Sequence, residues 1–225
     1  MAETTEQPSS APPGLTREAE EAGFYHEAAL NASWTGSRLA LGGLSFGFGA
    51  FVFAFFYLRS LNSHNDWYPA GFKNPQLWAG TLVVALIVVS ALLQTGALQR
   101  IKAGHKGPWL GGATVALVLG LAAIAIQIWQ LNDLPFSPGY CGFASVFVGF
   151  WPVFVTIAFG AMVWLEILIM RARPIPEMAF VEQPPTYVEA FAVQRFQAAL
   201  SAFTVVWNYL AIVAIVAWVL FYLVH

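Results

Sequence analysis

The sequence has little charge. Charged side chains make up 10% of its 225 residues, whereas a soluble domain has roughly 25%. Ten Lys and Arg residues stand against 12 Asp and Glu residues, which gives a formal net charge of −2. The chain therefore lacks the basic surface that nucleic-acid binding requires, and it lacks the polar residues that would cover a water-soluble fold.

Cysteine and histidine are also scarce. The single cysteine, Cys141, excludes an internal disulfide, a Cys-x-x-Cys metal or redox motif and c-type haem attachment. The four histidines, His26, His64, His105 and His225, all lie outside the long apolar runs. Haem or copper within a bilayer is usually held by histidine at membrane depth. We therefore expect this chain to bind no redox metal or other cofactor of its own.

Hydrophobic side chains make up 58% of the sequence, and the mean hydropathy is +0.65. They gather in five long runs, and about 20 apolar residues suffice to cross a hydrocarbon core about 30 Å thick. The sequence therefore predicts an all-α polytopic membrane protein, with a leader over residues 1–37 and a membrane domain over residues 38–225. The five predicted spans cover residues 39–58, 77–98, 109–131, 142–170 and 198–224.

Both the leader and the last span are expected to extend into the cytoplasm. A Pro- and Ser-rich start, expected to be disordered, precedes residues 16–30, which predict a short surface helix. Thr186-x-x-Glu189 has the form of a capping box, so the last helix is expected to start near Tyr187. Its first turns are expected to pack either on another subunit or on this chain's own leader.

The basic residues predict the orientation in the membrane. The positive-inside rule places the side that carries more Lys and Arg in the cytoplasm. Only Arg59 and Lys73 fall on one side of the predicted spans, and the other eight fall on the opposite side. The N-terminus is therefore predicted to be cytoplasmic and the C-terminus to lie outside. The eight cytoplasmic residues are Arg17, Arg38, Arg100, Lys102, Lys106, Arg171, Arg173 and Arg195.

Lipid penalises polar groups, so polar side chains within the spans are the first candidates for function. Glu166 is the only ionisable one; it precedes Met170 by four residues, roughly 6 Å of helix rise from the cytoplasmic boundary. We expect Glu166 to have one of two roles. It either takes up a proton or contacts a lipid headgroup, or it forms an ion pair at the membrane interface. The arginines expected to be available for that pair are Arg100, Arg171 and Arg173.

Three amides and several small residues predict helix packing. Gln94, Gln127 and Asn208 lie within the spans, where amides commonly hydrogen-bond to a neighbouring helix. Small residues at four-residue spacing permit close helix approach, which we expect mostly within the chain. These small residues are Gly43 and Gly47, Ser45 and Gly49, and Gly112, Ala116 and Gly120.

Recognisable catalytic motifs are lacking. The sequence has no phosphate-binding Gly-rich loop, no nucleophile with its base and no metal-binding His/Glu set in the spans. Five helices also do not divide into the repeated halves of common transporters. We predict no catalytic, cofactor-binding or metal-binding residues, and the residues alone favour a structural or accessory membrane subunit.

A series of short motifs follows the first span. It includes Trp67-Tyr68-Pro69-Ala70-Gly71, then Ala125-Ile126-Gln127-Ile128-Trp129-Gln130, then Gly139-Tyr140-Cys141-Gly142-Phe143, and finally Trp207-Asn208-Tyr209 with the ending Leu220-Phe221-Tyr222-Leu223-Val224. In this order they resemble the motifs of subunit III of the haem-copper terminal oxidases, the cytochrome c and quinol oxidases, in its five-helix form. The sequence departs from that family where Gly149 to Phe154 lacks two expected histidines, and where Asn208 and Ala211 replace His and Asp.

The resemblance implies an accessory, non-redox subunit of a respiratory haem-copper terminal oxidase in a bacterial cytoplasmic membrane. Such a subunit packs against the catalytic subunit I and other subunits of the respiratory complex, which carry the haem and copper, and it binds phospholipid between its helices. From the helix order we expect lipid contacts at four residues. They are Trp78, Gln94, Arg100 and Trp109.

Other interpretations stay open at this point. One is the related five-helix subunit associated with nitric oxide reductases. Another is a small channel or carrier built around Glu166 and Gln127. A membrane-embedded enzyme is a third, against which stands the absence of a convergent His/Asp/Glu set in the sequence.

Overall fold

The computed structural model describes residues 17–61, 67–180 and 187–224, and within these ranges it is all-helical. Five of its helices are each long and apolar enough to cross a membrane. This confirms the predicted fold class, an all-α protein with several membrane-spanning helices. A 3-10 turn precedes the last helix, and a π-helix ends it. The elements are α1 (Arg17–Ser60), α2 (Leu77–Lys102), α3 (Lys106–Asn132), α4 (Gly142–Ala172), η1 (Glu177–Phe180), α5 (Tyr187–Trp218) and η2 (Val219–Val224).

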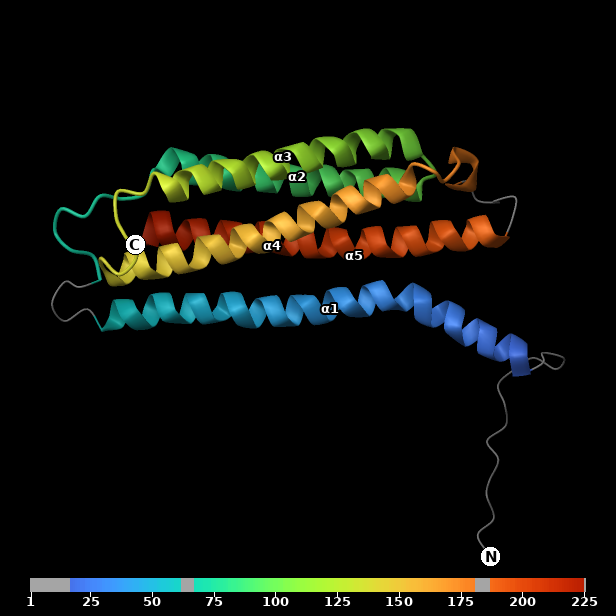
Figure 1. Ribbon diagram of the computed structural model, residues 1–225, viewed down its shortest axis with the longest axis horizontal. Coiled ribbons are helices and arrows are strands. Elements are labelled where there is room, and N and C mark those ends of the chain that lie inside the picture. The colour runs from blue at the N-terminus through green and yellow to red at the C-terminus, as the bar shows by residue number, and fades with distance from the viewer. Residues whose placement is uncertain (1–16, 62–66, 181–186, 225) are drawn as a thin grey trace, which may run out of the picture.

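The helices lie nearly parallel to one long axis in three layers (Figure 1). The antiparallel pair α2 and α3 forms one layer, α4 and α5 form the next, and α1 packs mainly against these two on the far side. Three fully buried indoles, Trp109, Trp151 and Trp207, fill the space between the layers. The core therefore lies among α2 to α5, with α1 at its edge.

Helix α1 is longer than the sequence predicts and less buried than the other four long helices. The expected surface helix over residues 16–30 and the span over residues 39–58 belong to one continuous helix, because no proline or turn sequence separates them. Only 11% of its most apolar stretch is buried, against 33% to 44% in the other four helices. Its N-terminal part bends away from the bundle in Figure 1. Helix α1 is thus held by fewer contacts than its neighbours.

The start of α5 does contact the start of α1. The rings of His26 and Phe191 lie 4.3 Å apart, so the first turns of α5 pack on this chain's own N-terminal helix. The Pro- and Ser-rich start of the leader lies outside the described residues, as do Thr186 and the side chain of Glu189 in the expected capping box.

The small-residue patterns have different roles on α3 and α1. A Cβ atom added at Gly112 would lie 3.2 Å from Cβ of Ala97 in α2, and one added at Gly120 would overlap Met162 in α4. By contrast, nothing lies within 4 Å of a Cβ at Gly43, Gly47 or Gly49. The pattern on α3 therefore serves packing within the chain, as predicted, whereas that on α1 does not.

An aromatic cluster closes the end of the bundle opposite the α2–α3 turn. The Phe143 backbone N–H donates to the Trp67 carbonyl at 3.2 Å, and the Trp67 ring lies 5.0 Å from Phe55 and 5.9 Å from Phe143. Burial in this cluster, and the nearby Cys141, raise the pKa of the Tyr68 phenol above its usual value of 10. The segment after α1 is thereby attached to the start of α4.

At the same end, Tyr222 of η2 fits against a glycine of α2. The Gln130 amide donates to the Tyr222 hydroxyl and to the Gln76 carbonyl, both at 2.9 Å. A Cβ atom at Gly80 would overlap the Tyr222 ring. The absence of a side chain at Gly80 thus allows the contact that joins α2, α3 and η2.

We expect Gly80→Ala to lower the free energy of unfolding by about 1–3 kcal/mol, because the added methyl displaces a buried ring from its hydrogen bond. The matched control is Gly96→Ala in the same helix, where a Cβ meets nothing within 4 Å. Alanine favours a helix over glycine by up to about 1 kcal/mol, so the control should match or exceed the wild type. Unfolding in mild detergent measures both; equal stability of the two variants would contradict this packing.

Candidate functional site

A hydrogen-bond network joins α2, α3 and α5 within the bundle. The Ser90 hydroxyl donates to the Ala116 carbonyl at 2.7 Å, and the Trp207 indole N–H donates to the Ser90 hydroxyl at 3.1 Å. Nearby, the Asn208 amide donates to the Thr95 hydroxyl at 3.1 Å. Asn208 therefore bonds between helices, as its sequence position predicts. Ser90 and Trp207 are network members that the sequence alone did not single out.

Gln94 and Gln127 do not make the bonds expected of them. They are 0% and 1% exposed, and neither amide nitrogen nor amide oxygen has a partner among the described residues. Gln94 follows Ser90 by four residues on the same face of α2, and Gln127 precedes the bonded Gln130 by three on α3. An unsatisfied buried polar group costs about 1–3 kcal/mol. Both amides therefore carry a desolvation cost that no described hydrogen bond offsets, as do the buried indole N–H groups of Trp109 and Trp151.

Glu166 faces outward from α4. Its side chain is exposed, and it forms no ion pair with any described residue, including the expected partners Arg100, Arg171 and Arg173. No described side chain offsets its charge. The carboxylate therefore belongs to the outer surface of the bundle.

Glu166 and Gln127 do not lie together. The packing of Gly120 against Met162 sets the register of α3 and α4. From that contact Gln127 is seven residues toward one end and Glu166 four residues toward the other, so they lie roughly 16 Å apart along the bundle. One residue is buried and the other faces outward. The pair does not form the centre of a channel or carrier path within the described residues.

Of the four residues expected to contact lipid, Gln94 is the buried amide described above. The other three lie in three separate places. Trp78 is 58% exposed at the start of α2, where its ring lies 5.6 Å from that of Trp129. Arg100 is exposed at the opposite end of the same helix. Trp109 is fully buried, with its ring 5.3 Å from Phe196. Trp78 and Arg100 are thus surface positions at opposite ends, and Trp109 is a core residue that does not face lipid.

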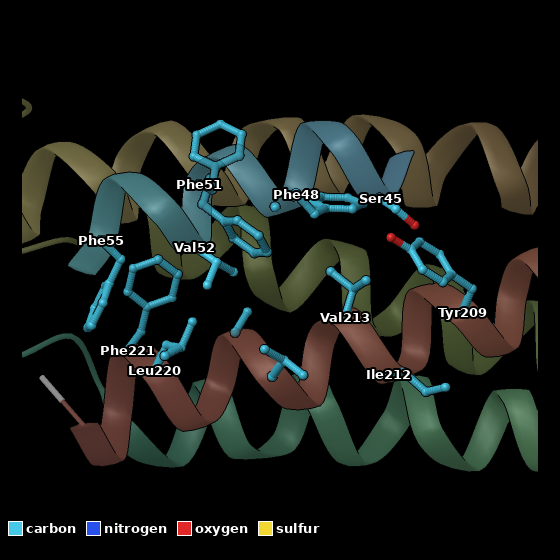
Figure 2. Close-up of a pocket in the computed structure, with 14 residues that line it drawn as sticks. Ser45, Phe48, Phe51, Val52, Phe55, Tyr209, Ile212, Val213, Leu220 and Phe221 are labelled. Atoms are coloured by element: carbon cyan, nitrogen blue, oxygen red, sulfur yellow. The ribbon is translucent and has the colours of Figure 1, made fainter. Parts of the chain in front are cut away.

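A cavity of about 140 Å³ lies between α1 and α5. Its walls are apolar apart from two hydroxyl groups, those of Ser45 on α1 and Tyr209 on α5. Figure 2 shows the two hydroxyls pointing toward one another at one end of the cavity. Neither hydroxyl hydrogen-bonds to a described residue. Two polar groups without a described partner, one from each helix, thus meet at an apolar cavity that both helices line.

Sequence reasoning missed this site. In the sequence, Ser45 stands out only as a small residue, and Tyr209 only as part of a motif. A serine and a tyrosine 164 positions apart carry no spacing signal, because their proximity depends on how α1 packs on α5. The available clue was a phenol ring at membrane depth, which also belongs among the polar candidates.

We expect Gln94→Leu to raise the free energy of unfolding by about 1–3 kcal/mol, because it removes an unsatisfied amide at nearly constant shape. Ser90→Ala, one turn away, is the control; it breaks two hydrogen bonds and should lower stability. Unfolding of both variants in the same detergent gives the comparison. A loss of stability in Gln94→Leu as large as that in Ser90→Ala would show that the amide has a partner.

The described residues contain no group of three or more His, Cys, Asp or Glu side chains placed to hold a metal ion. Their notable polar features are instead the two buried amides, the outward carboxylate and the hydroxyl pair in the cavity between α1 and α5. Comparison with protein-family models and with curated proteins finds no match to the chain. Its function is therefore argued from its own residues and their geometry.

Proposed function

We propose that the protein is an accessory, non-redox subunit of a respiratory haem-copper terminal oxidase of the cytochrome c oxidase type. In this proposal it stabilises the catalytic subunit in a bacterial cytoplasmic membrane and binds phospholipid. Haem and copper belong to the partner subunits, and this chain contributes helices, a binding surface and lipid contacts.

The convergence of the oxidase-like motif segments is the observation that carries the proposal. Residues 67–71 and 139–143 are far apart in sequence, yet the Phe143 N–H donates to the Trp67 carbonyl. The Phe221 ring at the end of the chain lies 5.9 Å from Phe143, and Tyr222 accepts a hydrogen bond from Gln130 of the third segment. Segments that follow the order of the oxidase subunit III motifs thus also contact one another in the fold. This convergence supports the resemblance to that family.

The outward groups suit a subunit that docks on a larger membrane protein. Glu166 on α4 lacks a partner within the described chain, and a charged group near the hydrocarbon region is costly unless it is paired. Helix α1 exposes most of its apolar surface and unfilled glycine positions. A catalytic subunit could supply a hydrogen-bond donor to the Glu166 carboxylate. A helix of the same subunit could pack on α1 and cover its exposed apolar surface.

Purification of the tagged protein in mild detergent tests the proposal. We expect haem absorption bands in the visible spectrum and, by mass spectrometry, a co-purifying catalytic subunit of terminal-oxidase type. A colourless protein without partners contradicts the proposal. A co-purifying nitric oxide reductase would instead assign the chain to that related assembly.

Glu166→Gln examines the docking surface in the same preparation. Loss of the charge should lower the yield of haem-bearing partner several-fold, because the paired carboxylate stabilises the complex. Glu177→Gln is the matched control, since Glu177 is also exposed but lies in η1, outside the candidate spans. Equal yields from both variants would exclude Glu166 from the interface.

The proposed location includes a cytoplasmic N-terminus. The α2–α3 turn with Lys102 and Lys106 lies at the same end of the bundle as the end of α4 with Arg171 and Arg173. The Lys106 ammonium donates to backbone carbonyls of Arg173 and Ile175 there. This concentration of basic residues at one end supports a cytoplasmic assignment for that end.

Single cysteines test the orientation. We expect a membrane-impermeant maleimide, added to intact right-side-out membranes, to label Ser137→Cys but not Gln99→Cys. Both positions are exposed, at opposite ends of the bundle. The background is Cys141→Ser, because Cys141 is the only native cysteine and its sulfur caps α4 by accepting from the Ala144 N–H, which serine can also do. The reverse labelling would invert the proposed topology.

A further inference from the structure

The cavity between α1 and α5 continues as a groove along both helices. Its lining runs from Ser45 to Phe55 on α1 and from Tyr209 to Phe221 on α5. At 1.5 Å per residue these stretches extend roughly 15 Å and 18 Å, about half the thickness of a hydrocarbon core. The two hydroxyls lie at one end of this length and the aromatic cluster at the other (Figure 2). The groove thus has one polar end and a long apolar remainder.

The lining favours a neutral ligand with a flat or unsaturated body. No charged side chain contributes to the groove, so a charged headgroup finds no partner there. Aromatic rings prefer stacked and edge-to-face contacts with other π systems. The phenylalanines that line the groove are Phe48, Phe51, Phe55, Phe150 and Phe221.

The two hydroxyls require a hydrogen-bond acceptor. Hydroxyls within membrane helices commonly bond to the carbonyl four residues earlier, as those of Thr95 and Thr204 do here at 2.9 Å and 2.8 Å. The Ser45 hydroxyl makes no such bond, and neither it nor the Tyr209 hydroxyl has a described partner. A carbonyl oxygen has two lone pairs, so one ligand carbonyl placed between them accepts from both. The terminal methyl of an acyl chain would leave both hydroxyls unsatisfied.

The cavity has the size of one six-membered ring. Its volume is about 140 Å³, and a dry cavity of roughly 150 Å³ lined by Leu, Ile and Phe binds benzene. This volume belongs to the whole groove between α1 and α5, so a ring that carries a carbonyl takes up much of it beside the hydroxyls. The attached apolar chain then leaves through the open side of the groove into the surrounding lipid. Ring, carbonyl and long unsaturated tail occur together in the isoprenoid quinones.

We propose that the groove between α1 and α5 binds an isoprenoid quinone. One ring carbonyl accepts hydrogen bonds from Ser45 and Tyr209, the ring lies against Phe48, and only the start of the tail follows the groove, while the rest lies in the surrounding lipid. This inference goes beyond the accessory role proposed above and does not depend on an oxidase partner. It concerns binding only, and it includes no electron-transfer step.

Quinone retention by the purified full-length chain tests this inference. The protein is incubated with decylubiquinone in detergent and passed through a gel-filtration column, and quinone per protein is measured by chromatography after extraction. We expect saturation near one quinone per chain. The double variant Ser45→Ala/Tyr209→Phe should weaken binding about tenfold or more, because both donors are lost. Tyr57→Phe removes an exposed phenol elsewhere on α1 and should bind as the wild type does.

A second pair of variants fills the groove or leaves it open. Gly49 lines it, and a Cβ there meets nothing within 4 Å, so Gly49→Leu projects into free space. Gly47 has equal room but lines a separate shallow cavity between α1 and α4, which makes Gly47→Leu the matched control. We expect Gly49→Leu to abolish quinone retention and Gly47→Leu to preserve it. Thermal unfolding shows whether each variant is folded. If Gly49→Leu does not fold, quinone retention by the double variant Ser45→Ala/Tyr209→Phe decides whether the groove binds quinone.

Three results would overturn the proposal. The first is a folded wild-type chain that retains no quinone. The second is equal retention by Gly49→Leu and Gly47→Leu. The third is a phospholipid retained by the wild type and lost in Gly49→Leu without any quinone bound, which would assign the groove to an acyl chain. None of these results bears on haem-protein co-purification, so failure here is distinguishable from failure of the accessory role.

Discussion

Hydrogen bonding in a medium without water is the constraint on which this structure depends. In hydrocarbon every backbone N–H and C=O needs a partner within the protein, so membrane spans are helical. The same requirement extends to side chains, and Ser90 illustrates how it is met. Its hydroxyl donates to the Ala116 carbonyl and accepts from the Trp207 indole, so one small group connects three helices. Close approach then depends on small residues such as Gly112 and Gly120.

The bundle divides into a tightly connected part and a loosely attached helix. Helices α2, α3 and α5 share hydrogen bonds, and α4 packs on Gly120 of α3 and carries many of the buried aromatic rings. Helix α1 contributes Phe48 and Phe55 to the core but leaves its glycines open. Because nothing draws α1 fully onto α5, a groove remains between them, with Ser45 and Tyr209 facing one another inside it. Loose packing of one helix is therefore what creates the candidate binding site.

The polar residues show how far sequence reasoning reaches. Asn208 bonds to Thr95 on another helix, as its place in an apolar run predicts. Gln94 and Gln127 occupy equivalent positions in apolar runs yet have no described partner. Whether a buried amide finds a partner depends on which groups the neighbouring helices place opposite it. That arrangement follows from helix register, which hydropathy alone does not contain.

The sequence by itself determined the helical class, the number of apolar helices and the scarcity of charge, since each follows from composition and from the length needed to cross lipid. Tertiary structure alone decided which residues face inward. It buried Trp109, turned Glu166 outward and joined the two early segments into α1. It also brought Ser45 to Tyr209, because contacts between distant helices depend on their packing and relative rotation, and neither is encoded in the spacing of residues along one helix.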